Sequence, residues 1–224
     1  MKIIAIANQK GGCGKTTLAM GLAGTFGCWG HKVLVVDADL QATASRWAAS
    51  APDDAPFPAA VTGLAATGGK LHREVRKHVA DYDYIFIDCP PAVESNTPQS
   101  ALLISNLAIV PVVPSPADLW AARGIRQIIE TAQDINEALK SMLVANMIPR
   151  TSLGREAMDA LEDFGIPLAE SGLGQRTAYR EAALYGSPVQ SLGSRARDAT
   201  REIEALAHEV LIWTKTSNEE EAAQ

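Results

Sequence analysis

The chain has 224 residues and a formal net charge of −6, so it can bury one sizeable core, and it repels nucleic acid and anionic membranes unless a local patch binds them. Hydrophobic residues make up 47% and aromatic residues 5%, which suits helices packed on a sheet and disfavours an aromatic-rich β-sandwich. Three cysteines without paired spacing argue against zinc and iron–sulfur sites, and the lack of a signal peptide or a membrane-length apolar run predicts a cytoplasmic protein.

Five short runs of the chain are almost wholly apolar, and each is predicted to be a buried strand of a parallel sheet. They cover residues 3–7, 33–36, 84–87, 107–113 and 142–148. The segments predicted to be helices are 15–28, 70–80, 97–106 and 117–140, followed by 151–164, 177–185 and 195–214. Because strands and helices alternate, we expect a doubly wound α/β fold, with a mostly parallel sheet and helices on both faces.

Two stretches fall outside this alternation. Residues 51–63 carry several prolines and are expected to form a loop or a short edge segment. Residues 215–224 are acidic and poor in apolar residues, so we expect a flexible tail there. The remaining residues, 1–214, are predicted to form a single domain, because no linker interrupts them.

The stretch NQKGGCGKTT, residues 8–17, lies between the first predicted strand and the first predicted helix. It departs from the general phosphate-binding pattern G-x-x-x-x-G-K-[ST], because Gln9 takes the place of the first glycine and Lys10 follows it. A flexible glycine-rich turn is the alternative, but the strand–loop–helix context favours a loop whose N–H groups surround the phosphates of ATP or ADP. Lys15 is expected to reach the β- and γ-phosphates, and Thr16 to coordinate Mg²⁺. The predicted nucleotide-binding residues of this loop are Gly11, Gly12, Cys13, Gly14, Lys15, Thr16 and Thr17.

Three aspartates stand at the carboxyl ends of predicted strands. Asp37 and Asp39 follow the second strand, and Asp88 ends the strand YIFID. Ligands of open α/β sheets bind at this edge, so we expect these carboxylates to lie near the phosphate loop, with Asp88 in the Mg²⁺ shell through water. Taken singly, each could instead be a helix cap or a turn residue.

The motifs together resemble a known family. KGGCGKTT, DADLQ and YIFIDCPP match the loop and the two aspartate motifs of the deviant Walker A ATPases, and PVVPSPADLWAARG and RTAYREAALYGSPV look like their later blocks. The sequence is most similar to the ParA-type plasmid and chromosome partition ATPases, in the short form without an N-terminal helix-turn-helix. The resemblance implies a P-loop NTPase fold over residues 1–214 and a Mg²⁺-dependent ATPase.

The resemblance also implies roles for single residues. Lys10 would reach across an ATP-dependent sandwich homodimer to the phosphates bound by the other subunit, acting as an arginine finger does. Lys10, Lys15 and Asp39 would be the catalytic residues, with Asp39 orienting the attacking water. Asp37 would lie nearer the metal, which would be held by Thr16, Asp37 and Asp88.

Two further residues near the loop are candidates for a role. Asn146, at the end of the fifth predicted strand, matches a position that contacts adenine in relatives, although asparagine at a strand end is also a common turn residue. Cys13 lies just before a helix, and a helix N-terminus can lower a thiol pKa, which suggests a redox-sensitive cysteine.

A basic segment follows the predicted fifth strand, and between residues 171 and 201 five arginines face only two acidic residues. The resemblance implies that ATP-bound dimers bind DNA without sequence preference through this region. The alternative is a solvated face with local ion pairs, since Arg197 and Arg201 lie at helical spacing from Asp198 and Glu202. The candidate DNA-binding residues are Arg176, Arg180, Arg195, Arg197 and Arg201.

The expected activity is DNA partition. A ParB-like centromere-binding adaptor would stimulate hydrolysis, and the ATP form would be associated with the nucleoid. Two alternatives stay open: a MinD-like membrane-associated positioning ATPase, and a ParA-like positioner of a non-DNA cargo. Membrane binding is not expected, because three consecutive glutamates follow the last predicted helix. Iron–sulfur relatives of the same superfamily would need cluster cysteines.

Overall fold

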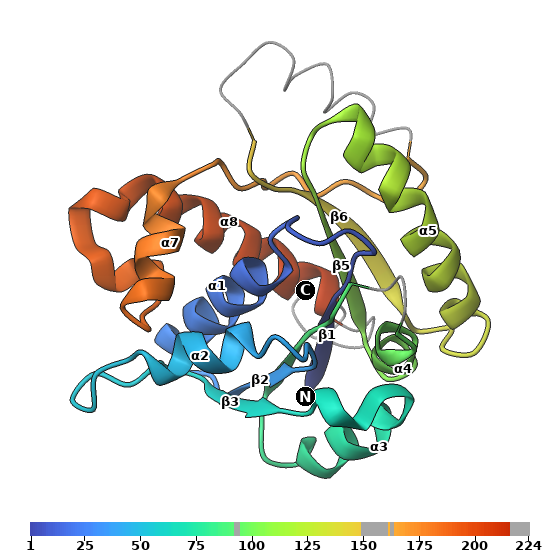
Figure 1. Cartoon of the computed structure of the whole chain (residues 1–224), viewed down its shortest axis with the longest axis horizontal. Coiled ribbons are helices and arrows are strands. Elements are labelled where there is room, and N and C mark those ends of the chain that lie inside the picture. Colours follow the sequence, from blue (N-terminus) through green and yellow to red (C-terminus); the bar gives the residue numbers. More distant parts are fainter. Residues whose placement is uncertain (92–94, 149–160, 162–163, 216–224) are drawn as a thin grey trace, which may run out of the picture.

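The protein is built around one sheet of six parallel strands in the order β3-β2-β4-β1-β5-β6 (Figure 1). The computed structural model describes residues 1–91, 95–148, 161 and 164–215. The strands are β1 (Lys2–Ile6), β2 (Val33–Asp37), β3 (Ala60–Gly63), β4 (Tyr84–Asp88), β5 (Leu107–Val112) and β6 (Lys140–Ala145). The predicted apolar runs therefore form a parallel sheet, as their uniform burial requires.

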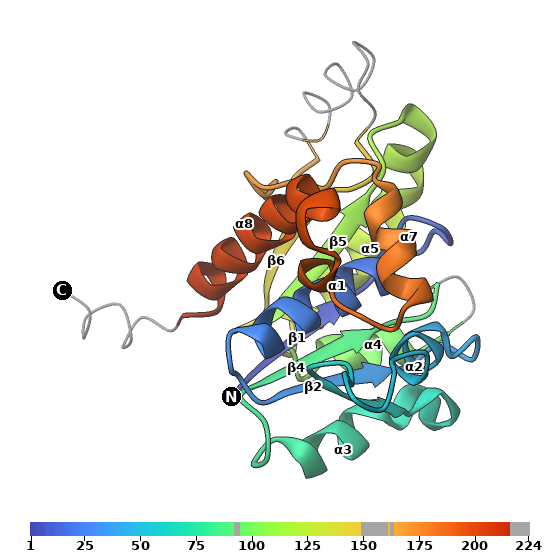
Figure 2. The ribbon, with the colours of Figure 1, turned by 90° about the vertical axis from the view of Figure 1, so that its left-hand side faces the viewer.

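Helices cover both faces of this sheet. The helices are α1 (Lys15–Cys28), α2 (Thr43–Ala49), α3 (Leu71–Val75), α4 (Thr97–Leu102), α5 (Pro116–Gln133), α7 (Thr177–Leu184) and α8 (Arg197–Thr214). Three 3₁₀ segments, Ala65–Lys70, Arg76–His78 and Val189–Ala196, complete the helical elements of the described chain. Figures 1 and 2 show α1, α7 and α8 on one face and α3, α4 and α5 on the other. No helix in this part of the chain is long and apolar enough to cross a bilayer.

The core consists of two apolar layers, one on each face of the sheet. Along β1, Ile4 and Ile6 join the layer beneath α1 and α8, whereas Ile3 and Ala5 join the layer beneath α5. Successive strand residues point to opposite faces, so a strand that is apolar at every position fills both layers. The doubly wound fold predicted from the alternation is confirmed.

The predicted element boundaries need several corrections. The helix α2 and the 3₁₀ segment Val189–Ala196 were not predicted, whereas the short edge segment expected within 51–63 is confirmed as the edge strand β3. The predicted helix 97–106 ends at Leu102, and 70–80 forms only the short helix α3 and a 3₁₀ turn. The predictions for 151–164 and for the tail fall largely outside the described residues.

The predicted helix 117–140 is also too long, because α5 ends at Gln133. Asn136 fixes the segment that follows the helix. Its side-chain amide donates hydrogen bonds to the carbonyl oxygens of Leu102 (2.9 Å) and Ser105 (2.8 Å). These bonds join the end of α5 to the segment before β5 and leave β6 to begin at Lys140.

Candidate nucleotide-binding site

The strand register brings the predicted site residues to one edge of the sheet. Asp37 at the end of β2 pairs in register with Asp88 at the end of β4, and Asp88 also pairs with Ile6 at the end of β1. The loop of residues 8–14 follows β1, so it begins beside both carboxylates. Both aspartates are almost fully buried. This is the edge at which ligands of open α/β sheets bind.

The loop turns into α1 at Gly14, which has a φ of 88° and caps the helix. A Cβ atom at this position would lie 2.2 Å from Nδ2 of Asn146. Asn146 follows β6 and is buried; its Nδ2 donates a 2.8 Å hydrogen bond to the carbonyl oxygen of Cys13. Asn146 therefore holds the loop in position, a role that the sequence did not indicate. Its predicted contact with adenine stays a prediction.

The side chain of Lys15 lies inside the loop. The residue is 7% exposed, and its Nζ donates a 2.9 Å hydrogen bond to the carbonyl oxygen of Lys10 and lies 4.0 Å from Sγ of Cys13. Burial raises the pKa of the Cys13 thiol, although the nearby Lys15 ammonium opposes this. The suggested lowering of the Cys13 thiol pKa is therefore wrong, because burial has the larger effect, whereas a redox role for Cys13 stays a prediction.

Asp88 and Thr16 form a pair directly below the loop. The Thr16 hydroxyl donates a 2.7 Å hydrogen bond to Oδ2 of Asp88, while Oδ1 of Asp88 is buried and has no hydrogen-bond partner among the described residues. Burial raises the pKa of Asp88 to about 7, and the charges of Asp37 and Asp39 add to this, against the Thr16 hydrogen bond and Lys15. A buried carboxylate oxygen without a hydrogen-bond partner is a candidate ligand for a cation.

The donor set at this point fits Mg²⁺. The Thr16 hydroxyl and the carboxylates of Asp37 and Asp88 are hard oxygen ligands, which Mg²⁺ prefers. One of these oxygens, Oδ1 of Asp88, has no partner in the described structure. Groups of three or more His, Cys, Asp or Glu that could hold a metal ion are absent from the described residues. Protein sites for Mg²⁺ use one or two carboxylates and leave the other positions to phosphate and water. Thr16, Asp88 and Asp37 are the residues that would hold it.

Asp37 and Asp39 have different surroundings. Oδ2 of Asp37 accepts hydrogen bonds from the Ser45 backbone N–H (2.8 Å) and hydroxyl (2.7 Å), so Asp37 also anchors the start of α2. Asp39 is half-buried, and its Oδ1 accepts a 2.9 Å hydrogen bond from the Gln41 backbone N–H. Asp39 therefore forms a turn at the rim of the site, and its charge is close enough to Asp88 to act on the pKa of that group.

Lys10 occupies a different place from Lys15. Its ammonium forms an ion pair with Oδ1 of Asp118, in the first turn of α5, and its side chain is 41% exposed. The two lysines of the loop are thus separated: Lys15 is enclosed, whereas Lys10 lies on the outside against another helix. Asp118 was not among the predicted site residues, because it stands 108 residues from Lys10 in the sequence.

A cavity of about 210 Å³ opens beside the loop, next to the start of α1. Its lining includes Thr16, Thr17, Trp47, Asn146, Met147 and Tyr179. The mixture of apolar and aromatic side chains with a few polar groups is typical of a small-molecule site. The cavity adjoins the loop where a nucleoside attached to the loop's phosphates would lie.

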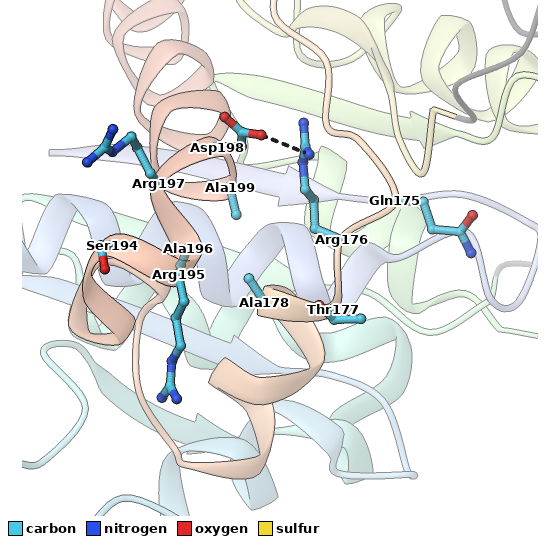
Figure 3. Close-up of a pocket in the computed structure, with 10 residues that line it drawn as sticks. All are labelled: Gln175, Arg176, Thr177, Ala178, Ser194, Arg195, Ala196, Arg197, Asp198 and Ala199. Carbon is cyan, nitrogen blue, oxygen red and sulfur yellow. Dashed lines mark hydrogen bonds and ion pairs between the residues drawn. The ribbon is translucent and has the colours of Figure 1, made fainter.

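A larger cavity of about 460 Å³ lies between the starts of α7 and α8 and is lined by Arg176, Arg195 and Arg197 (Figure 3). Arg176 is engaged there: its guanidinium contacts Glu202 at 2.5 Å and Asp198 at 3.1 Å, and 21% of its side chain is exposed. Figure 3 shows the side chains of Arg195 and Arg197 extending in opposite directions. The predicted basic residues therefore do not converge on one point.

The remaining predicted arginines differ in their partners. Arg195 lies 3.6 Å from Glu181, and Arg201 lies 3.3 Å from Asp198. Arg180 and Arg197 are exposed and form no ion pair with any residue that the structure describes. The alternative of local ion pairs holds for Arg201, which pairs with Asp198, and not for Arg197 within the described chain. Arg176, which is held by two carboxylates, is the least exposed of the five candidate arginines. DNA binding by this segment stays a prediction.

Comparison with known proteins agrees with this geometry. The family model of the CobQ/CobB/MinD/ParA nucleotide binding domain matches residues 4–189. The "Maintenance of carboxysome distribution protein A" of Halothiobacillus neapolitanus is 32% identical over 211 residues, which cover 93% of this chain and 95% of that protein. The "Chromosome partitioning protein ParA" of Caulobacter vibrioides is 24% identical over 234 residues, covering 84% and 86%.

A solved structure gives the same result for the fold. The septum site-determining protein MinD from Pyrococcus horikoshii, complexed with Mg-ADP, superimposes with a TM-score of 0.74 at 25% identity, covering 93% of this chain and 95% of that one. The predicted resemblance, the P-loop fold and the ATPase activity are thereby confirmed. This chain belongs to the CobQ/CobB/MinD/ParA family of nucleotide-binding domains and is a P-loop ATPase of the ParA/MinD type that uses Mg²⁺ and ATP.

Proposed function

We propose that this chain is a positioning ATPase whose ATP-bound form is a sandwich homodimer, and that its cargo is a large non-DNA assembly. The observation that carries the proposal is the separation of the two loop lysines. Lys15 lies within the phosphate loop, whereas the ammonium of Lys10 lies outside it on Asp118. A cation on the outer side of the loop could reach the phosphates of a second subunit once it leaves Asp118, and there it would stabilise the charge that develops during hydrolysis.

Within one subunit, the roles follow the geometry of the loop. The N–H groups of residues 11–17 and the ammonium of Lys15 hold the phosphates, since Lys15 needs only to leave the Lys10 carbonyl. Thr16, Asp88 and Asp37 hold Mg²⁺, which neutralises phosphate charge when bound. Asp39, at the rim, orients the attacking water. Positioning of this kind is sufficient for phosphoryl transfer, because the reaction demands little proton abstraction by the protein.

The choice of cargo rests on the relatives. The Halothiobacillus relative, named for carboxysome distribution, is more similar to this chain and matches more of it than the Caulobacter relative named for chromosome partitioning. A protein assembly is therefore the first candidate for the cargo, and DNA partition, favoured by the Caulobacter relative, is the second. In either case a separate adaptor protein would couple the cargo to the ATPase and stimulate hydrolysis.

The two candidates are distinguished in the cell that carries the gene. Deletion should cluster the protein assemblies and leave their number unchanged, while plasmid and chromosome inheritance stay normal. Loss of plasmids or anucleate cells with normally spaced assemblies would contradict the proposed cargo and favour DNA partition.

The ATP-bound form is proposed to bind DNA without sequence preference. Arg180 and Arg197, which are exposed and lack ion-pair partners within the described chain, are the candidates with most freedom to contact phosphates. Replacing both with glutamate should lower DNA retention and reduce the slope of log affinity against log salt by about 1 per lost contact. Arg73→Glu combined with Arg76→Glu, in and directly after α3 at the opposite face of the sheet, makes the same change in charge and is the matched control. Equal retention by all variants would remove this patch from the proposal.

A further inference from the structure

The segment Gln9–Lys10 rests on helix α5 at two points. The ammonium of Lys10 pairs with Asp118 in the first turn of α5. Six residues farther along the same helix, Gln9 packs on Gly124: a Cβ atom there would lie 2.0 Å from Oε1 and 2.4 Å from Nε2 of Gln9. The absence of a side chain at position 124 therefore allows the loop to approach the helix. We call this arrangement of Gln9 and Lys10 against Asp118 and Gly124 the α5 latch.

Asp118 is held rigidly for its contact with Lys10. The residue is 8% exposed, and its Oδ2 accepts a hydrogen bond from the Ser115 hydroxyl. The Asp118 backbone N–H in turn donates to the Ser115 Oγ at 3.2 Å, which makes Ser115 the cap of α5. With Oδ2 engaged, Oδ1 is the oxygen directed at Lys10. A carboxylate kept in place by its own helix loses little conformational entropy when it binds an ammonium.

The latch is connected to the nucleotide site through Lys15. The Lys15 ammonium donates to the carbonyl oxygen of Lys10, so the backbone of the latch is held from inside the loop. Phosphates that enter the loop compete for the same ammonium, because an anion is a stronger partner than a neutral carbonyl. When Lys15 turns to phosphate, the Lys10 carbonyl loses its ammonium donor and keeps the weaker Cys13 thiol, while the Lys10 side chain keeps its contact with Asp118.

We infer that the α5 latch keeps Lys10 bound in cis in the nucleotide-free monomer, and that Asp118 is a positioning residue that sets how readily Lys10 becomes available to a second subunit. This inference rests on the proposed function, in which Lys10 acts across the dimer. Lys10 cannot serve Asp118 and the phosphates of the partner at the same time. Weakening the latch therefore favours the ATP dimer, whereas removing Lys10 prevents it.

The test uses Asp118→Asn in the full chain, with two readouts. The first is the rate at which an amine-acylating reagent labels Lys10 in the nucleotide-free monomer, measured by mass spectrometry, because an ion-paired ammonium reacts more slowly. The second is the ATP concentration at half-maximal dimerisation, from size exclusion with light scattering in Mg²⁺. We expect labelling to rise about threefold to tenfold and the half-maximal ATP concentration to fall by a similar factor, the scale of one partly exposed ion pair.

Two further variants keep the test specific. Ser115→Ala keeps the carboxylate but removes the hydroxyl that orients it, so Lys10 labelling should rise less than in Asp118→Asn. Gly124→Ala displaces Gln9 without changing any charge, so labelling should rise as in Asp118→Asn. Circular dichroism of each variant checks that α5 and the fold are retained.

The outcomes separate this inference from the proposed function. Unchanged Lys10 labelling in Asp118→Asn, or an equal rise in Ser115→Ala, would overturn the latch. Faster labelling with unchanged or weaker dimerisation would overturn its role in regulation. If Lys10→Ala dimerises as the wild type does, the proposed trans role of Lys10 fails, while the labelling result still decides whether the latch exists.

Discussion

Replacing Asp88 with asparagine tests the electrostatics of the site most sharply. The carboxyl group is buried, its Oδ1 has no partner in the described structure, and burial raises its pKa to about 7. In the unfolded chain the same group has a pKa of about 3.9. Between these two values the folded state binds more protons than the unfolded state, so the group lowers the free energy of unfolding as pH rises. Asparagine has no such dependence.

The expected size of the effect follows from the two pKa values. The full shift corresponds to about 4 kcal/mol, of which roughly 2–3 kcal/mol develops between pH 5 and pH 8. Static differences between the two side chains, such as the amide hydrogens that asparagine adds near Asp37, are the same at every pH and cancel in this comparison. In a chain of this length the change corresponds to about 5–10 °C in Tm.

The assay is urea or thermal unfolding of nucleotide-free protein in EDTA at several pH values between 5 and 8. Relative to wild type, Asp88→Asn should become progressively more stable as pH rises. Asp39→Asn, the same substitution at the rim of the site, controls for the loss of a nearby negative charge. The result that would refute the raised pKa is a constant stability difference between Asp88→Asn and wild type from pH 5 to pH 8. It would also remove the electrostatic support for cation binding by Asp88.

Three other substitutions test the loop and its supports. Gly14→Ala should weaken ATP binding at least about tenfold in a fluorescent-nucleotide titration, because the new Cβ atom meets Asn146. Gly30 has the same φ of 88° but open space around it, so Gly30→Ala should bind ATP normally. Equal losses of affinity in both variants would show that backbone strain alone is responsible. Asn146→Ala should lower the unfolding free energy by about 1–3 kcal/mol and weaken ATP binding, because it removes the hydrogen bond to the Cys13 carbonyl. A changed preference for ATP over GTP would support the predicted adenine contact as well. Unchanged ATP binding would contradict the role of Asn146 in supporting the loop. Glu202→Gln, at the contact between α8 and the start of α7, should lower the unfolding free energy by about 1–3 kcal/mol, because it weakens the contact with Arg176. An unchanged urea midpoint would mean that this ion pair does not stabilise the fold.

The parts of this protein that could be predicted are those encoded locally. Short apolar runs rich in valine and isoleucine are typical of strands buried on both faces, and the strand–loop–helix context of Lys15 and Thr16 is contiguous in the sequence. Asp37 and Asp88 were found because parallel strands place their carboxyl ends at one edge, and the register bears this out.

The parts that could not be predicted depend on contacts between distant segments. Asp118 and Gly124 meet Lys10 and Gln9 only after α5 has packed beside the loop, and nothing in PADLWAARG marks either residue for that contact. Asn146 was located correctly, but its hydrogen bond to Cys13 joins residues 133 apart. The helix α2 was missed because it is short and its start is fixed by Asp37 rather than by a cap of its own.

The central claim is that ATP drives dimerisation through Lys10. Size exclusion with light scattering, in ATP and Mg²⁺, should compare wild type with Lys10→Ala and Asp39→Ala, followed by DNA retention on the same fractions. The account predicts that Asp39→Ala accumulates a DNA-bound dimer and that Lys10→Ala stays monomeric. If all three proteins remain monomeric and free of DNA in saturating nucleotide, ATP does not drive dimerisation through Lys10, and the account is contradicted.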